Sequence, residues 1–545
     1  MAMPIATAAA RGISPIELRL YQSRTQAICD EMGVVLRRAA FSPNIKDRLD
    51  FSCALFDSAG RLSAQAAHIP VHLGSMAFAM ADIVERFDWR VGDVVVVNDP
   101  FHGGTHLPDV TVVAPAFAAE QLIGFVANRA HHANIGANEP GSMPLSRTLD
   151  EEGIVIAPQL LLRDGVVQSA AAALLERVAG IQLPPQALLQ HVALGDFRAQ
   201  VSANEIGLAR LHKLVATMGV HEFISSSVAL DAYGARLATQ ALARLPQGRC
   251  AFTDYLDDDG QGTQDLPICV RIDIDAERLI VDFTGTAPQV PGNVNCPLAV
   301  TAAAVFYVFR CLLPAQTPAC AGTFALIELR APLGCLVNAC SPAAVAAGNV
   351  ETSMRIVDAM LGALQQVLPK QIPAASQGSM NNIAMGVADA AMRWDYYETV
   401  AGGHGASATK HGLSARHSHM TNTLNTPVES LEAHYPLRVR RYALRRDSGG
   451  NGEWRGGDGV EREFEFLAPT RVTLLSERRT HAPWGVAGGA DGAKGENRLN
   501  DALLPGKFAF TASPGDRLLI RTPGGGGYGP PSAMSKPFAV TLPGK

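Results

Sequence analysis

Side chains that bind metal ions are concentrated in one short stretch of this sequence. Residues 98–109 read Asn-Asp-Pro-Phe-His-Gly-Gly-Thr-His-Leu-Pro-Asp, and a pair of histidines follows at residues 131 and 132. Imidazole nitrogens together with a carboxylate oxygen suit zinc, manganese or iron. The sequence therefore predicts a divalent-metal site, with open coordination positions, formed by His106, Asp109 and His131.

A predicted β-hairpin brings these three side chains together. Residues 110–117 and 122–127 are apolar and rich in β-branched side chains, and the connection between them is of hairpin length. In this hairpin the numbers of facing residues sum to about 239. His131 is then expected opposite Pro108, beside both His106 and Asp109. A register shift of one residue would turn His132 toward the site instead.

Two histidines upstream of the hairpin form a second polar group. His68 and His72 are four residues apart, but Pro70 between them favours an extended loop over a helical pair. They are candidates for a base, a further ligand or a structural role.

Two polar segments later in the chain are further candidates for contact with a substrate. Residues 348–355 place Glu351 in a turn that enters a helix, although helix capping alone would explain the Thr-Ser pair in this segment. Residues 417–423 form a polar loop that contains His419. This loop is expected to line either a substrate site or a subunit surface.

Composition excludes several classes of protein. The chain has 545 residues, of which 47% are hydrophobic and 18% charged, a composition typical of a globular protein. Its net charge of −5 gives no indication of a basic surface for nucleic acid. Its longest apolar run, residues 298–313, is broken by Arg310 and is too short to span a membrane, which predicts a buried helix. The nine cysteines are scattered without a C-x-x-C motif, and residues 1–12 do not resemble a secretory signal. We therefore expect a cytoplasmic protein without a membrane or nucleic-acid partner.

The pattern along the chain predicts an α+β protein with several domains. Helices are expected over residues 15–38 and 202–245. The predicted regions are an N-terminal α/β region that carries the hairpin and the metal (13–248), a middle α/β region (249–400), a glycine-rich β region (401–531) and two tails (1–12 and 532–545).

Several common catalytic motifs are absent from the sequence. The chain lacks G-x-x-x-x-G-K-[ST], H-E-x-x-H and G-x-S-x-G. It has a G-x-G-x-x-G match in 523–530, but prolines follow this match, which favours a tightly packed loop over a dinucleotide site.

Several motifs, in order, resemble the hydantoinase B/oxoprolinase family over about residues 13–531. They lie at residues 14–18, 44–48, 67–76, 98–109, 128–132, 292–295, 348–353, 419–423, 448–452 and 524–529. The resemblance implies an ATP-dependent amidohydrolase of cyclic amides such as hydantoins, 5-oxoproline or lactams, or an ATP-dependent ketone carboxylase. Two residues depart from the expected pattern, Asp47 in place of Glu and Ala67 in place of Pro, and the shorter Asp47 leaves its acidic contact in doubt.

The resemblance also implies a metal, a partner and roles for the remaining polar residues. In acetone carboxylases a divalent metal is held by an H-x-x-D pair and a histidine 25 residues after the first, a spacing that His106, Asp109 and His131 match. A hydantoinase A-type ATPase subunit is expected to bind ATP, so the protein is expected to form a hetero-oligomer. The candidates for the catalytic acid or base are His132, His102, His68 and Asp99, and those for substrate contact are His72, Asp47, Glu351 and His419.

Three functions remain open from the sequence. The first is a metal-bearing subunit of a cyclic-amide hydrolase, in which the metal polarises a carbonyl or activates water. The second is a subunit of a ketone carboxylase with the same metal site. The third is a scaffold without catalysis, for which replacing His106 by alanine would leave the activity of the complex intact.

Overall fold

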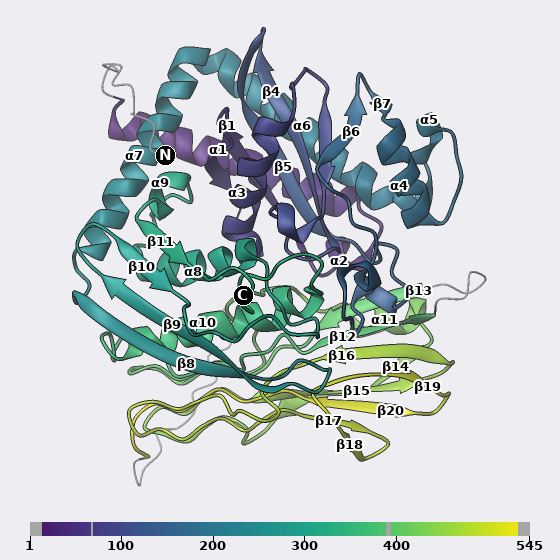
Figure 1. The fold of residues 1–545 in the computed structure, drawn as a ribbon, viewed down its shortest axis with the longest axis vertical. Coiled ribbons are helices and arrows are strands. Elements are labelled where there is room, and N and C mark those ends of the chain that lie inside the picture. The colour runs from purple at the N-terminus through teal and green to yellow at the C-terminus, as the bar shows by residue number, and fades with distance from the viewer. Residues whose placement is uncertain (1–12, 67–68, 388–393, 532–545) are drawn as a thin grey trace.

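The computed structural model describes residues 13–66, 69–387 and 394–531. The strands of this part of the chain form four sheets, of seven, four, four and five strands. In Figure 1 the N-terminal sheet lies at the top, the middle region at the left and the two C-terminal sheets at the bottom. The mixed helical and sheet content agrees with the predicted α+β class.

The N-terminal sheet is antiparallel and has the order β2-β1-β5-β4-β3-β6-β7. Its central strands are buried on both faces, because alternate residues of β5 contact different cores: Val126 and Ala130 face one core, and Phe125 and Ala127 face the other. The strands are β1 (Phe51–Asp57), β2 (Leu62–Gln65), β3 (Val94–Val97), β4 (Asp109–Ala118), β5 (Gln121–His131), β6 (Gln159–Arg163) and β7 (Val166–Val167).

Helices cover both faces of this sheet. α1 (Pro15–Ala39) begins with a capping box between Ser14 and Glu17 and ends with two arginines in its last turn, as a stable helix should. It packs with α6 on one face, and α3 packs on the other. The other helices of the region are α2 (Pro43–Lys46), α3 (His72–Ile83), α4 (Ser169–Ala179), α5 (Pro185–Leu188), α6 (Gly195–Met218) and α7 (Val220–Leu242).

The middle region packs two helices against a four-stranded sheet. α8 (Leu298–Leu312) is the buried helix predicted from the apolar run, and it contacts α10 (Ser353–Gln365), which lies on β8 and β9. A π-helical turn, Gly348–Thr352, leads into α10. The other elements are β8 (Gly248–Asp258), β9 (Gln264–Ile274), β10 (Leu279–Asp282), α9 (Ala321–Phe324) and β11 (Ile327–Arg330).

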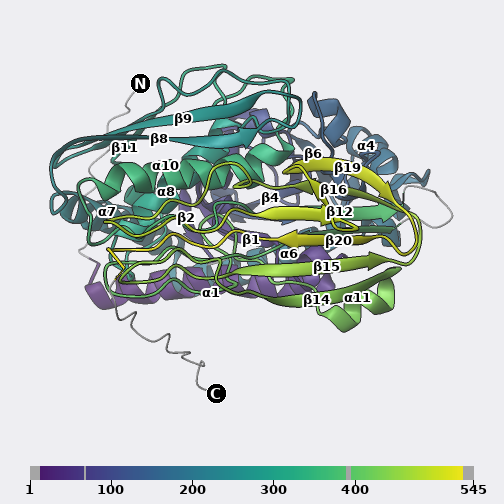
Figure 2. The ribbon, with the colours of Figure 1, turned by 90° about the horizontal axis from the view of Figure 1, so that it is seen from below.

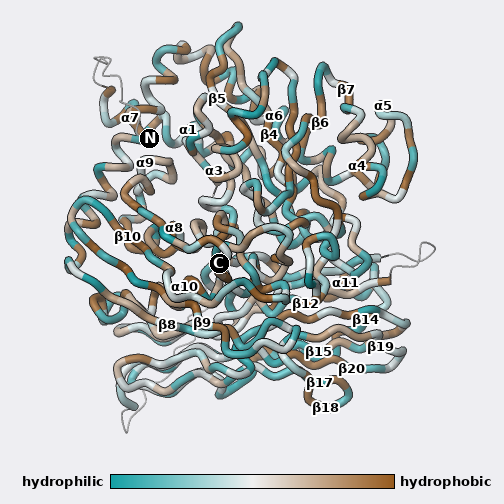
Figure 3. Tube along the Cα trace, viewed as in Figure 1, coloured by the Kyte–Doolittle hydropathy of each residue, from teal (hydrophilic) through white to brown (hydrophobic). Residues whose placement is uncertain are grey.

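Two C-terminal sheets pack face to face through a separate apolar core. One has the order β13-β12-β16-β19 and the other β14-β15-β20-β17-β18, and Figure 2 shows their strands from below. The elements are β12 (Asn382–Val387), β13 (Trp394–Thr399), α11 (Val428–His434), β14 (Leu437–Arg445), β15 (Gly459–Phe466), β16 (Thr470–Leu475), β17 (Glu496–Leu499), β18 (Ala502–Leu504), β19 (Lys507–Ala512) and β20 (Arg517–Arg521). In Figure 3 apolar segments run through the interior of the molecule, and many outer turns are hydrophilic.

Glycine-rich loops join these sheets by close backbone contact. A Cβ atom on Gly456 would lie 1.9 Å from the carbonyl oxygen of Gly525, which leaves no room for a side chain. Gly525 N donates to Gly457 O, and Gly526 N donates to Ala375 O. The loop at 523–529 is thus a packed connection, as predicted.

Two predictions about boundaries need correction. The boundary predicted at residue 400 cuts through a sheet, because β12 and β13 of the predicted middle region pair with β16 of the C-terminal region. The single helix predicted over 202–245 is two helices, because Gly219 has a φ of +87° that ends α6 before α7 begins. Among the helices of the described residues, none combines the length and the apolar character that a membrane span requires.

Candidate metal centre

The β4–β5 hairpin places Asp109 and His131 directly opposite each other. Its register pairs Asp109 with His131 at one end and Ala118 with Gln121 at the other, and the tight turn has Ala119 at a φ of +51°. The pairing predicted with Pro108 is therefore wrong by one residue. A bulge between Ala116 and Phe117 causes the shift, because it adds one residue to the path of one strand.

His106 reaches the same end of the hairpin from the loop that precedes β4. The backbone N–H of Asp109 donates to His106 O at 3.1 Å, which turns the chain back toward the strand. The buried Asn98 holds this loop: its Nδ2 donates to Leu107 O and Ile154 O, and its Oδ1 accepts from Ile156 N. Gly103 has a φ of +82° and lies against Ala79 of α3, where a Cβ atom would come within 2.3 Å.

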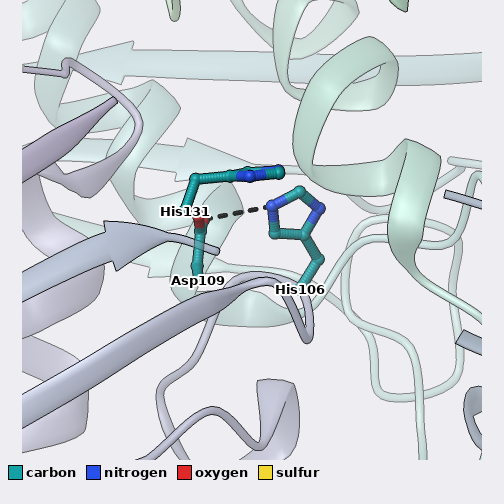
Figure 4. A group of neighbouring side chains, drawn as sticks. All are labelled: His106, Asp109 and His131. Carbon is teal, nitrogen blue, oxygen red and sulfur yellow. Dashed lines mark ion pairs between the residues drawn. The ribbon is translucent and has the colours of Figure 1, made fainter. Parts of the chain in front are cut away.

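The three predicted ligands form one buried group. One ligand atom from each of His106, Asp109 and His131 lies within 4.8 Å of the other two. Each residue is at most 2% exposed. Figure 4 shows the three side chains converging, with the carboxylate of Asp109 facing the imidazole of His106; Nε2 of His106 lies 3.3 Å from Asp109 Oδ2.

Several atoms of this group lack a hydrogen-bond partner among the described residues. They are Nε2 of His106, Nε2 of His131, Nε2 of His72 and Oδ1 of Asp109. Unpaired polar atoms are costly to bury, and a cation held by them would offset that cost. The group lines a cavity of about 20 Å³, which is room for one ion or one water molecule. The donor set and the space therefore fit a divalent metal.

The neighbours of the ligands influence which protonation states they adopt. Nδ1 of His106 lies 3.3 Å from Ala346 O, so this carbonyl fixes the ring proton on Nδ1 and leaves Nε2 for a ligand. Burial raises the pKa of Asp109, but His106 and His72 outweigh this effect and hold the pKa well below its usual range. Burial, assisted by His106, lowers the pKa of His131 well below its usual range. Asp109 is thus a carboxylate and His131 a neutral imidazole, as metal ligation requires.

Asn44 contacts the remaining ring nitrogen of His131. Its side-chain amide lies 3.0 Å from Nδ1, and Arg48 Nη1 donates to its Oδ1 at 3.3 Å. A histidine that ligates through Nε2 carries its proton on Nδ1, so metal binding requires the amide oxygen of Asn44 to face the ring.

Two further titratable residues line the cavity. Nε2 of His72, the first residue of α3, lies 3.4 Å from Asp109 Oδ2, and its Nδ1 lies 2.9 Å from Ser52 Oγ. Asp50, which sequence reasoning missed, lies in the lining, and burial raises its pKa. It is brought there by the pairing of β1 with β5, since His131 N donates to Asp50 O at 3.0 Å. Asp47 is half-buried and does not line the cavity, so the acidic residue at this site is Asp50.

A tyrosine from the C-terminal half of the chain supports His131. The rings of His131 and Tyr397 stack with centroids 4.7 Å apart and planes within 10°. Tyr397 Oη donates to Asn382 Oδ1 at 2.6 Å, and Asn382 Nδ2 donates to Glu351 Oε1 at 2.9 Å. Glu351 also accepts from Met380 N and lies outside the cavity lining. It therefore supports Tyr397 rather than contacting a substrate as predicted.

The structure places three of the predicted acid or base residues away from the cavity. His132 points to the opposite face of the sheet, because successive residues of a strand alternate, and its Nε2 lies 2.9 Å from Gln200 Oε1 on α6. His102 contacts Asp82 through Nδ1 at 2.9 Å, and Asp99 Oδ1 accepts from Phe101 N as a helix cap. None of these three residues lines the metal cavity, and their acid or base role stays a prediction. His68 lies outside the described residues.

His419 also lies beyond the cavity lining. Its Nδ1 is 3.4 Å from Tyr307 Oη and its Nε2 is 3.7 Å from Asp358 Oδ1. The residues that follow it, Met420, Thr421 and Thr423, do line the cavity. The loop predicted to line a substrate site thus reaches the centre, but through other side chains.

Comparison with known proteins identifies the family. The sequence profile of the hydantoinase B/oxoprolinase family matches residues 14–531, and the chain belongs to this family. It is 39% identical over 541 residues to 5-oxoprolinase 1 of Arabidopsis thaliana, covering 94% of this chain and 42% of that protein. It is 32% identical over 547 residues to a subunit of a putative D-/L-hydantoinase of a Pseudomonas species, covering 95% of this chain and 90% of that protein. The chain thus spans about two fifths of the oxoprolinase and most of the hydantoinase subunit.

Two solved structures share the fold. The ATP-dependent caprolactamase from Pseudomonas jessenii superposes with a TM-score of 0.86 at 26% identity, covering 95% of this chain and 91% of that chain. A nucleotide-free acetone carboxylase superposes with a TM-score of 0.82 at 18% identity, covering 95% and 76%. The likeness to the carboxylase is one of fold alone.

The first prediction concerns metal content. We expect the wild-type chain to carry about one divalent ion after purification without added metal. His106→Ala and Asp109→Asn should each reduce this content by at least about tenfold, because each removes a ligand atom. The matched control is His102→Ala, a histidine of the same loop outside the cavity, which should keep its metal. Elemental analysis by mass spectrometry measures all four proteins, and a fully loaded His106→Ala would contradict the site.

The second prediction concerns the support from Tyr397. Tyr397→Phe keeps the stacked ring but removes the hydrogen bond to Asn382, so metal affinity should fall about tenfold. The control is Tyr396→Phe, because Tyr396 is equally buried but packs against Tyr435 on the other side of the strand. Competition with a chromogenic chelator gives both affinities. Equal affinities for the two variants would rule out this role.

The third prediction concerns pH and Glu351. Burial, with Glu477 nearby, raises the pKa of Glu351 from 4.5 to about 8. The folded state therefore holds this proton more tightly than the unfolded state, and the stabilisation is lost as pH rises through about 8. Glu351→Gln keeps the acceptor oxygen but cannot ionise. The melting temperature of the wild type should fall by a few degrees relative to Glu351→Gln between pH 6 and pH 9, and parallel melting profiles would contradict the raised pKa.

Proposed function

We propose that this chain is the metal-bearing subunit of an ATP-dependent cyclic-amide hydrolase that opens hydantoin, 5-oxoproline or lactam rings. The observation that carries the proposal is the buried group of His106, Asp109 and His131, whose unpartnered ligand atoms face one cavity. Membership of the hydantoinase B/oxoprolinase family supports the substrate class. The relatives are named as a 5-oxoprolinase, a hydantoinase subunit and a caprolactamase, and each of these names describes an enzyme of cyclic amides.

The ATPase is proposed to reside in a partner of hydantoinase A type, giving a hetero-oligomer. The relative from Pseudomonas is named as one subunit of its enzyme, and this chain covers most of that subunit but only about two fifths of a 5-oxoprolinase. The remaining length of the oxoprolinase is available for a second functional part. The chain also lacks the phosphate-binding motif G-x-x-x-x-G-K-[ST]. These observations favour a division in which ATP is spent outside this chain.

The proposed reaction needs help because resonance stabilises an amide against attack. Transfer of a phosphoryl group from ATP to the amide oxygen, on the partner, would make the ring carbon a better electrophile. Addition of one water and cleavage of the C–N bond would then give an amine and an acyl phosphate, and a second water would release inorganic phosphate from the acyl phosphate. A divalent metal held by His106, Asp109 and His131 would supply a Lewis acid that polarises a carbonyl and lowers the pKa of bound water. Zinc, manganese and iron all suit this donor set.

The chain's own residues would then manage the proton and the solvent. Nε2 of His72 borders the cavity without a hydrogen-bond partner among the described residues, so we propose that it accepts a proton there and returns it to the leaving nitrogen. Ser52 Oγ at its Nδ1 fixes the plane of the ring. Met380 and Met420 line the cavity with apolar atoms. The cavity has room for only one ion or one water molecule. A substrate ring therefore reaches it only when side chains of the lining, such as Met380 and Met420, move.

The fourth prediction tests the proposal by activity. The chain is co-expressed with the proposed ATPase partner of hydantoinase A type. The complex is then screened for ring opening and ATP hydrolysis with 5-oxoproline, hydantoin and lactams. His106→Ala should lower kcat for ring opening at least about 1000-fold, because the polarising metal is lost, whereas His102→Ala should stay within about twofold of the wild type.

Two results would contradict the proposal. Full ring-opening activity of the His106→Ala complex would favour a scaffold without catalysis. ATP turnover that depends on a ketone and bicarbonate, with none on cyclic amides, would instead identify a carboxylase subunit.

A further inference from the structure

A second hollow lies directly beside the metal cavity. It has a volume of about 530 Å³ and lies between the first half of α1, the end of α8 and the segment that follows α8. Ile69 lines both spaces. Asn422 lines the hollow, whereas its neighbours Thr421 and Thr423 line the metal cavity. The wall between the two spaces is therefore about one side chain thick.

The hollow is cationic and rich in hydrogen-bond donors. Arg19 and Arg310 line it together with the side-chain amides of Gln22, Gln26, Gln65, Gln316 and Asn422. A neighbouring hollow of about 530 Å³ shares Arg19, Gln22 and Gln316 with it and adds Arg236 of α7. Among the described residues that line the two hollows there is no aspartate or glutamate.

Three carboxylates close to the hollows have partners other than the arginines. Asp30 accepts from Nε2 of Gln26, a residue of the lining, at 3.2 Å. Glu17, two residues before Arg19, caps α1 by accepting from Ser14 N at 2.8 Å. Asp231, on α7 one turn before Arg236, accepts from Gly322 N and lies 3.8 Å from Arg61. Among the described residues, none of these acids forms an ion pair with Arg19, Arg236 or Arg310.

The arginines differ in how they are held. Arg310 is half-buried, and its two Nη atoms donate to Pro314 O, Ala315 O and Thr317 O, so it shapes the wall while its charge remains. Arg19 and Arg236 are exposed, and their contacts are local, with Gln22 and with the ring of Tyr233. These two arginines are thus available to a ligand, and their guanidinium groups suit carboxylate or phosphate oxygens.

We propose that the joined hollows, here called the arginine vestibule (Arg19, Arg236 and Arg310 with the amides named above), form the entrance to the metal cavity and select ligands that carry a carboxylate or phosphate group. The proposal rests on the proposed function, and it narrows the substrate class to cyclic amides that reach the centre as anions. The negative charge belongs either to a ring substituent of the substrate or to a phosphoryl group added at the ATPase. Attraction of an anion into a cationic recess raises its local concentration and its rate of entry.

The test compares two ligands that share a ring but differ in charge. 5-Oxoproline carries a carboxylate, 2-pyrrolidinone is the same lactam without it, and inorganic phosphate probes the phosphoryl alternative. The variant is Arg19→Gln/Arg236→Gln, which removes two exposed charges and leaves Arg310 to hold its loop. The matched control is Arg24→Gln/Arg244→Gln, which removes two exposed arginines from α1 and from just after α7 that do not line either hollow.

Calorimetry on the co-expressed complex gives the binding constants. The vestibule variant should bind 5-oxoproline, phosphate or both at least about tenfold more weakly than the wild type, and 2-pyrrolidinone within about twofold. The anion that is lost identifies the source of the charge. The control variant should bind every probe within about twofold of the wild type. Unchanged binding of both anions, equal weakening of the neutral lactam, or an equal loss in the control would each overturn the proposal.

Steady-state kinetics separate the vestibule from the metal centre. If the anion is the ring carboxylate, the vestibule variant should raise KM for 5-oxoproline about tenfold with kcat unchanged, because its residues do not touch the reacting atoms. His106→Ala should instead lower kcat. If the wild-type complex turns over no cyclic amide, the proposed function fails, while the binding constants still decide whether the vestibule selects anions.

Discussion

The carboxylate of Asp109 is buried beside two imidazoles, and the surrounding structure is arranged around this charge. Its Oδ2 accepts from Thr105 Oγ1 and Asn349 Nδ2 and lies within 3.4 Å of both His72 Nε2 and His106 Nε2, while Oδ1 has no hydrogen-bond partner among the described residues. An ionised carboxylate is costly to bury without opposite charge or hydrogen bonds. The loop before the hairpin contributes two of these neighbours, Thr105 and His106, while the start of α3 contributes His72 and the turn before α10 contributes Asn349. A divalent cation would complete the balance of charge.

Strand β5 connects this centre to the rest of the chain. It pairs with β4 on one side and β1 on the other, so Asp109, His131 and Asp50 meet at one end of a sheet that is buried on both faces. From the opposite direction, β13 brings Tyr397 onto His131, and the turn before α10 brings Asn349 onto Asp109. Because Met420, Thr421 and Thr423 of the predicted C-terminal region also line the cavity, the centre lies where the three predicted regions of the chain meet. Formation of the centre consequently depends on the whole chain rather than on the N-terminal sheet alone.

Much of this arrangement could be predicted where it depends on local sequence. Alternating β-branched residues and a short connection sufficed for the β4–β5 hairpin and for the proximity of His106, Asp109 and His131. The bulge at Ala116 and Phe117 leaves no clear mark in the sequence, and it moved the register by one residue. Strand alternation predicts that only one of His131 and His132 faces the site, but the register decides which of the two it is.

Contacts between distant parts of the chain could not be predicted in the same way. Asp50 reaches the cavity because β1 pairs with β5, a pairing across about 80 residues that hydrophobic patterns do not specify. Tyr397 and Asn382 come from a hairpin more than 250 residues after His131. Glu351 is predicted to contact the substrate because it lies in a polar turn that enters a helix. The structure buries it and makes it a support, which is what its raised pKa reflects.

The central claim is that one metal ion binds between the N-terminal hairpin and its preceding loop. The most direct measurement is X-ray diffraction from crystals of the wild-type protein, collected on both sides of the absorption edge of the metal found by elemental analysis. The account predicts one anomalous difference peak within about 2.3 Å of His106 Nε2, His131 Nε2 and an oxygen of Asp109. A peak held by other residues, or none between these three side chains in protein that carries stoichiometric metal, would contradict it.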